Sequence, residues 1–147
     1  METKYTAEEQ KIVDTIIELE RSALEKYFKG DMSGYLNLWS KTNFSYFDAN
    51  CAKRIDDYKD IKKFFLENVE GKMHADSFDY YKPRVQLGKD MAVLTYQLHS
   101  DTNFIEMHYN VIEVFQLEGS EWKVIHSTWD LIQPFGDIKR PKVKVTV

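Results

Sequence analysis

Few of the 147 residues belong to the types that cross-link or interrupt a chain: one cysteine, three prolines and six glycines. The single Cys51 has no partner for an internal disulfide, so a reducing compartment is predicted, with the cytoplasm as the default. No uninterrupted apolar run approaches the ~18 residues that a membrane-spanning helix needs. Because the prolines and glycines are not clustered, no linker or low-complexity segment divides the chain.

Positive charge is also scarce over most of the sequence. The net charge is −4, but residues 138–147 contain four basic residues and no acid, which leaves −8 for residues 1–137. An acidic body argues against nucleic acid or an anionic membrane as a partner, since phosphate backbones are bound mainly through Lys and Arg. The basic tail at 138–147 is expected either to add an edge strand or to remain disordered.

Aromatic residues, by contrast, are abundant, with nine Phe, nine Tyr and three Trp, and several fall on predicted helices. The segment Thr6-Ala7-Glu8-Glu9 has the pattern of a capping box, and the apolar spacing after it predicts a helix from about residue 7 to 28. Gly30 is expected to end this helix and Asp31 to cap a short second one. A third helix is predicted to begin at about Asp57.

From His74 onward the pattern changes to alternating apolar and polar residues. This alternation predicts long strands at 75–87, 91–101, 105–118 and 121–133, after a short aromatic strand at 43–48. Pro83 cannot donate to a strand ladder, so the first long strand should lie at an edge or carry a bulge. The predicted fold class is α+β: three N-terminal helices packed on a curved, mostly antiparallel sheet that forms a cone with a cavity.

The order of these motifs resembles the SnoaL-like branch of the nuclear transport factor 2-like superfamily, a cystatin-like fold that also includes ketosteroid isomerase. The resemblance covers roughly residues 8–134 and rests on Lys29-Gly30-Asp31, Tyr46-Phe47-Asp48, Glu113-Val114-Phe115 and the last strand, residues 122–129. It implies one domain over residues 1–137 before the tail. Cones of this kind host isomerases, cyclases, dehydratases and non-catalytic assembly modules, so the fold does not choose a reaction.

Three candidate catalytic residues follow from this resemblance. Asp48 stands where ketosteroid isomerase has the carboxylate that moves a proton, and Glu113 matches the second acid, which stays protonated and donates to the developing oxyanion. The tyrosine that completes that site is missing, because its place falls near Ala23, but Tyr27 lies one turn later on the same helix face. Since losing one oxyanion donor costs on the order of 10²–10³ in rate, the departure argues against a steroid isomerase.

Structural explanations compete with the catalytic ones. A strand-end Asp such as Asp48 commonly accepts backbone N–H groups from the following turn. Glu113 interrupts an apolar strand, where an acid is costly unless it is partnered or occupies an exposed alternating position. The aromatic residues that we expect to line a ligand pocket are Trp39, Tyr46, Tyr96, Tyr109 and Trp129.

The histidines predict no metal site. All four lie on different strands or at strand ends, none pairs with another at the i, i+4 spacing of a helix, and there is no second cysteine. Relatives often carry two histidines near the end of the last strand, and here His126 remains while Thr128 replaces the second. We therefore expect neither a metal nor a cofactor.

Alternation in the last strand predicts its two faces. The resemblance places Trp129 in the cavity, and Ile125 and Ser127 then share its face, whereas the opposite face carries Trp122, Val124, His126, Thr128 and Asp130. We expect a homodimer through the sheet face bearing Trp122, His126 and Thr128. The leading hypothesis is a cofactor-independent isomerase, cyclase or dehydratase for a small apolar organic ligand, and the alternative is a non-catalytic ligand-binding or association module.

Overall fold

The computed structural model describes residues 4–133, so the predicted basic tail lies outside the described residues. The first half contains α1 (Ala7–Tyr27), α2 (Ser33–Leu38), β1 (Ser45–Asp48) and α3 (Tyr58–Asn68). The second half is formed by β2 (Asp79–Leu87), β3 (Met91–Asp101), β4 (Glu106–Glu118) and β5 (Glu121–Leu131). This order confirms the α+β prediction. None of the helices in residues 4–133 is long and apolar enough to cross a membrane.

Local signals begin and end α1 as predicted. Thr6 Oγ1 accepts the backbone N–H of Glu9 at 3.1 Å, and the Glu9 carboxylate accepts that of Thr6 at 2.9 Å, which completes the capping box. Gly30 has a φ of 81°, a left-handed conformation that glycine adopts without strain. The prediction for Asp31 is wrong by one residue: Met32 is the N-cap of α2, and Asp31 Oδ1 accepts the N–H of Ser33 at 2.9 Å.

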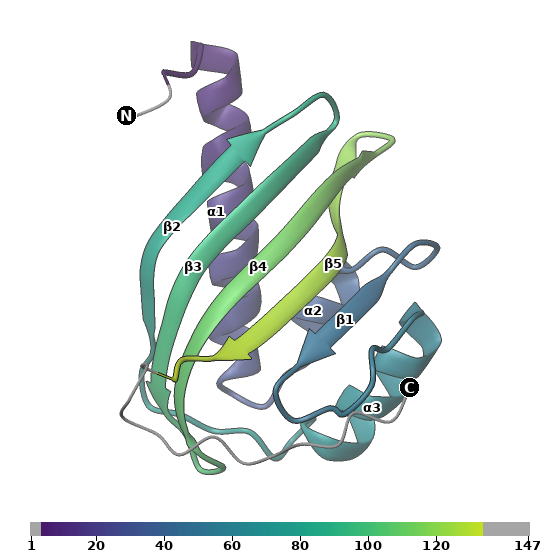
Figure 1. The fold of residues 1–147 in the computed structure, drawn as a ribbon, viewed down its shortest axis with the longest axis vertical. Coiled ribbons are helices and arrows are strands. Elements are labelled where there is room, and N and C mark those ends of the chain that lie inside the picture. Colours follow the sequence, from purple (N-terminus) through teal and green to yellow (C-terminus); the bar gives the residue numbers. More distant parts are fainter. Residues whose placement is uncertain (1–3, 134–147) are drawn as a thin grey trace.

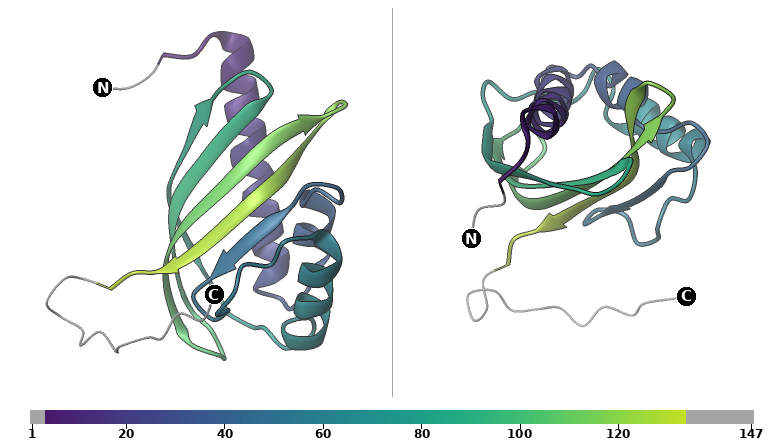
Figure 2. Two further views of the ribbon diagram at one scale, coloured as in Figure 1. Left: turned by 45° about the vertical axis from the view of Figure 1, so that its right-hand side comes forward. Right: turned by 90° about the horizontal axis from the view of Figure 1, so that it is seen from above.

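All five strands form one sheet in the order β1-β5-β4-β3-β2. The four long strands pair with one another in antiparallel fashion, and β1 runs parallel to β5 at one edge. Figure 1 shows α1 lying along one face of the long strands, and Figure 2 shows that all three helices cover the concave side of the curved sheet. The predicted cone is therefore confirmed, with β1 and α3 at one end of it.

Two β-bulges interrupt the ladders. The β2–β3 register shifts between Tyr81 and Arg84, around Pro83 on an edge strand, as predicted. A second bulge was not predicted: Val114 pairs with His126 and Phe115 with Val124, which leaves Ile125 as an extra residue of β5. An extra residue reverses the alternation of faces beyond it.

The bulge in β5 corrects the predicted faces of that strand. Val124 is fully buried, and Trp122 packs against the core and lines a hollow beside Leu19 of α1. His126 and Thr128 lie on the opposite, outer side of the sheet, because their neighbours Ser127 and Trp129 are buried. The prediction that Trp122 and Val124 share the outer face with His126 and Thr128 is therefore wrong.

An aromatic cluster fixes α2 and α3 against β1. The ring of Trp39 is fully buried, and its centroid lies 4.8 Å from that of Phe44, 4.9 Å from Phe65 and 5.4 Å from Tyr35. Such contacts exclude water and add the favourable geometry of aromatic pairs. The cluster makes this side of the cone solid and leaves the cavity on its other side, between α3 and the ends of β4 and β5.

Candidate functional site

A pocket of about 310 Å³ lies between α1, β1, α3, the β3–β4 turn and the sheet, a size at the lower end for small-molecule sites. Its polar side chains are Asp48, Asn50 and Asn68, together with the hydroxyl groups of tyrosines. Its apolar wall includes Phe64, Phe65, Val69, Met73, Ile105 and Met107. No Lys, Arg or His of the described residues lines it, so Asp48 provides the only charged side chain. The pocket suits a ligand that is mostly apolar and carries few polar groups.

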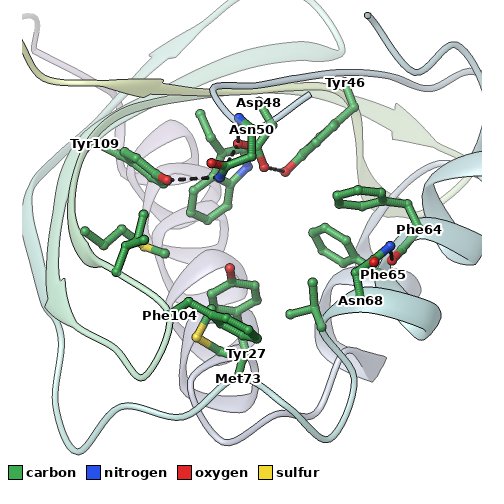
Figure 3. Close-up of a pocket in the computed structure, with 14 residues that line it drawn as sticks. Tyr27, Tyr46, Asp48, Asn50, Phe64, Phe65, Asn68, Met73, Phe104 and Tyr109 are labelled. Carbon is green, nitrogen blue, oxygen red and sulfur yellow. Dashed lines mark hydrogen bonds between the residues drawn. The ribbon is translucent and has the colours of Figure 1, made fainter. Parts of the chain in front are cut away.

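Asp48 is fixed at the polar end of the pocket by three hydrogen bonds (Figure 3). Its Oδ2 accepts from the hydroxyl of Tyr46 at 2.6 Å. Its Oδ1 accepts from the backbone N–H of Asn50 at 3.0 Å and from the side-chain amide of Asn50 at 3.2 Å. Two of these three bonds come from the following turn, in agreement with the prediction that a strand-end Asp accepts N–H groups from the turn after it. The carboxylate also lines the pocket, and Oδ2 keeps acceptor capacity for a ligand.

Tyr27 lies across the pocket from Asp48 in Figure 3 and stacks on Trp129, with ring centroids 5.9 Å apart and an interplanar angle of 29°. Burial, and secondarily the negative charge of Asp48, raises the pKa of Tyr27 well above its usual value. The hydroxyl therefore stays protonated at neutral pH. Among residues 4–133 it has no hydrogen-bond partner, so it is available as a donor to a ligand.

Tyr109 adds a further hydroxyl to the polar end. It accepts from the side-chain amide of Asn50 at 3.3 Å, so Asn50 connects it to Asp48. Burial raises the pKa of Tyr109, with Asn50 opposing that shift and Asp48 adding to it. The row formed by Tyr46, Asp48, Asn50 and Tyr109 gives the pocket one polar side (Figure 3).

The structure brings together five of the eight predicted site residues. Those that line the pocket are Tyr27, Tyr46, Asp48, Tyr109 and Trp129. Trp39 and Tyr96 are buried in the core instead, and neither lines the pocket. Glu113 points inward and is fully buried, which excludes the explanation that it occupies an exposed alternating position. It does not line the pocket, so it does not form a site there together with Asp48.

Glu113 faces a second buried acid, Glu20 of α1. The two carboxyl groups are within hydrogen-bonding reach of each other. Burial, opposed by hydrogen bonds from Tyr96 and Tyr35, raises the pKa of Glu20 to about 7. Burial, and next the negative charge of Glu20, raises the pKa of Glu113 well above its usual value.

Glu20 and several residues of the pocket were not predicted from the sequence as site residues. Glu20 lies four residues after Ile16 and three before Ala23, both buried, so its place in the apolar stripe was the available signal. Asn50, Asn68 and Phe104 lie in or next to turns, where no periodic pattern marks a residue as facing a pocket.

Outside the pocket, His126 lies on the outer face of the sheet, between Ser45 and Thr128. Its Nδ1 is 2.7 Å from Ser45 Oγ and its Nε2 is 2.6 Å from Thr128 Oγ1. Burial, followed by the positive charge of Arg54, lowers its pKa. Phe47 and Ile112 are exposed on the same face, with 46% and 41% of their surface accessible.

Potential metal ligands do not gather in the described part of the chain. Residues 4–133 contain no group of three or more His, Cys, Asp or Glu side chains arranged to hold a metal ion. Burial and the nearby Asp48 raise the pKa of the Cys51 thiol, which makes it a weaker nucleophile at neutral pH.

Comparisons with known proteins agree with this architecture. The SnoaL-like domain model matches residues 16–129. A candidate ketosteroid isomerase from Parabacteroides distasonis is 27% identical with a TM-score of 0.72, over 84% of this chain and 89% of the other. No curated protein matches the sequence.

Two further solved structures resemble the chain at lower identity, and their similarity shows a shared fold only. An NTF2-like protein of unknown function from Pseudomonas putida is 16% identical with a TM-score of 0.72, over 89% of this chain and 98% of the other. The CaMKII hub of S. rosetta is 19% identical with a TM-score of 0.64, over 81% of this chain and 95% of the other. The same fold therefore occurs in a CaMKII hub and in a candidate ketosteroid isomerase.

Proposed function

Because the chain belongs to the SnoaL-like family, we propose that its pocket binds a small, largely apolar, uncharged organic molecule and that Asp48 transfers a proton on it. One observation carries the proposal: a carboxylate held by Tyr46 and Asn50 lines an aromatic pocket that also contains the unpaired hydroxyl of Tyr27. A fixed base and a fixed donor on one apolar cavity are the two groups that proton transfer next to a carbonyl requires.

The proposed reaction moves a proton within one molecule. Asp48 Oδ2 removes a proton from a carbon next to a carbonyl, the electron pair moves onto the carbonyl oxygen, and Tyr27 donates a hydrogen bond to that oxygen. Asp48 then returns the proton to another carbon, or to a hydroxyl that leaves as water. Isomerisation and dehydration end in these ways. In a cyclisation, the enolate carbon instead forms a bond to a second carbonyl carbon of the same molecule, and Asp48 returns the proton to the alkoxide so formed. None of the three reactions needs a redox partner.

The charge of the pocket narrows the ligand class. Asp48 repels a carboxylate or phosphate, and none of the described lining residues is a cation that would neutralise one. Aromatic faces are also electron-rich and disfavour anions. A neutral ketone or enone with a compact apolar body fits these conditions best.

The test is a thermal-shift screen against hydrophobic ketones, enones and carboxylic acids, followed by turnover assays on the compounds that bind. Ligand binding raises the apparent Tm, and Asp48→Asn should abolish turnover while the circular dichroism spectrum and Tm stay unchanged. Full activity of Asp48→Asn on an identified substrate would refute the catalytic role.

A second candidate function, association into a homodimer, is favoured by the outer face of the sheet. Phe47 and Ile112 are exposed beside His126 and Thr128, and Phe47 packs edge-on against His126 at 5.7 Å. Exposed apolar side chains that lie together on one sheet face are typical of interaction surfaces. Assembly is compatible with catalysis, because the pocket lies on the opposite, concave side of the sheet.

A further inference from the structure

Two carboxyl groups, those of Glu20 and Glu113, lie in the interior of the cone and have no ionic partner. Both side chains are fully buried, and none of the ion pairs within residues 4–133 involves either of them. A lone buried carboxylate is costly, and two that face each other are more so. The protonation state of this pair therefore needs an explanation that the proposed proton transfer at Asp48 does not supply.

Neutral hydroxyl groups satisfy one oxygen of each carboxyl. Glu20 Oε2 accepts from Tyr35 at 2.8 Å and from Tyr96 at 2.5 Å. Glu113 Oε1 accepts from Ser127 Oγ at 2.8 Å. The remaining oxygens, Glu20 Oε1 and Glu113 Oε2, are buried with no donor from another residue. A single hydrogen between these two oxygens would satisfy both.

We propose that Glu20 and Glu113 share one proton at neutral pH and that this proton fixes a hydrogen-bond chain which positions Trp129 in the wall of the pocket. Glu113 is the donor to Glu20, because Glu20 already accepts from two hydroxyls. Glu113 Oε1 stays an acceptor for Ser127, whose hydroxyl oxygen accepts from Trp129 Nε1 at 2.7 Å. Every donor in the chain then has one acceptor.

Trp129, the last residue of this hydrogen-bond chain, lies at the pocket in which we propose that the ligand binds. Trp129 lines the pocket, and its ring stacks on Tyr27, the hydroxyl donor. Glu20 and Glu113 do not line the pocket, so they act through Ser127 and Trp129 as positioning residues. When the shared proton leaves, the two carboxylates repel each other, and Glu113 loses its fixed place as acceptor for Ser127.

The groups around the pair do not provide a compensating positive charge. Tyr35 of α2, Tyr96 of β3 and Tyr80 of β2 face it, and burial, followed by the charge of Glu20, raises the pKa of each. The nearest cation among the groups acting on Tyr80 is Arg21, which is exposed and bonded to Glu18 and Glu25. Proton loss from the pair is therefore expected only well above the pH range in which a carboxyl group ordinarily titrates.

The indole N–H resonance of Trp129 tests the proposal by NMR without any ligand, so the result does not depend on the proposed function. Trp129→Phe assigns the signal against those of Trp39 and Trp122. In the wild type the signal should shift between about pH 5 and about pH 9 in one titration. In Glu113→Gln, whose amide donates permanently to Glu20, the titration should disappear.

Glu67→Gln, an exposed change on α3, is the matched control and should leave the titration intact. Glu20→Gln is the mirror variant, whose amide donates to Glu113, and it should also abolish the titration if Glu113→Gln fails to fold. An infrared carbonyl band of a protonated carboxylic acid should be present in the wild type at neutral pH and absent from the folded variant. A flat wild-type signal, or a titration that persists in the folded Gln variant, would overturn the proposal.

Discussion

Tyr46 donates its hydroxyl to Oδ2 of Asp48 at 2.6 Å, although the two residues belong to the same short strand. Residues two apart on a strand share a face, so β1 directs both side chains toward the cavity and Phe47 between them toward the outer side. The buried ring of Tyr46 thereby sets the orientation of the carboxylate that we propose as the proton-transfer group.

Tyr46→Phe should therefore lower kcat by about tenfold, because it removes one charge-assisted hydrogen bond while leaving the ring in place. KM should change little, since the hydroxyl is engaged by Asp48. Both constants are measured on a substrate from the thermal-shift screen. Tyr58→Phe is the control, because the Tyr58 hydroxyl bonds to the Leu36 carbonyl away from the pocket; an equal loss in both variants would contradict the role of Tyr46.

Stability should fall as the pH rises through neutral. The ordinary pKa of a Glu is 4.5, whereas in the folded protein burial raises the pKa of Glu20 to about 7 and that of Glu113 well above its usual value. Between these values the native state binds more protons than the unfolded chain, so the free energy of unfolding decreases with pH by up to ~1.4 kcal/mol per pH unit for each extra proton.

Urea unfolding between about pH 5 and pH 9 measures this slope. Glu113→Gln should flatten it and should be more stable than the wild type at the alkaline end, because it removes the second carboxylate and keeps a donor to Glu20. A slope that is the same in the wild type and Glu113→Gln would show that other groups control the pH dependence.

The sequence shows that Glu113 is an unusual acid in an apolar strand, but it leaves open whether the side chain points inward, and it does not indicate a partner. Glu20 and Glu113 are 93 residues apart, and only the packing of α1 on the sheet brings them together. Each acid read alone suggests a surface position or a catalytic group. Their shared burial is a property of the tertiary structure.

The predicted faces of β5 were wrong for a related reason, because they also depend on contacts with another segment. The bulge at Ile125 arises from the pairing between β4 and β5. The position carries neither glycine nor proline, so its residue type does not predict a bulge. Local signals such as the capping box at Thr6 and the bulge at Pro83 were readable because the residue itself restricts the backbone. Where the partner strand determines the register, the sequence of one strand is not sufficient to predict which face each side chain occupies.

The pocket should discriminate against anions. A neutral ketone should raise the Tm more than the carboxylate of the same carbon skeleton, because Asp48 repels the latter. Asp48→Asn should improve carboxylate binding by about tenfold, corresponding to roughly 1.4 kcal/mol of removed repulsion in a partly hydrated site. Titration calorimetry measures both affinities.

Asp90→Asn is the matched control for charge, since Asp90 lies exposed in the β2–β3 turn and asparagine tolerates its positive φ. It should leave both affinities unchanged. If the wild type binds the carboxylate as tightly as the ketone, the proposed ligand class is wrong, while the pocket itself remains a binding site.

The outer face of the sheet gives the last prediction. Ile112 has 41% of its surface exposed at the centre of this face, opposite Thr128 and near Phe47. In a homodimer packed through the sheet, Ile112→Lys would bury a charge without a partner, which is expected to weaken association by at least tenfold. Light scattering at micromolar concentration should therefore give a dimer for the wild type and a monomer for Ile112→Lys. Leu66→Lys makes the same change at a residue of α3 that is 44% exposed, and it should remain dimeric. A monomeric wild type, or dissociation by both variants alike, would exclude assembly through this face.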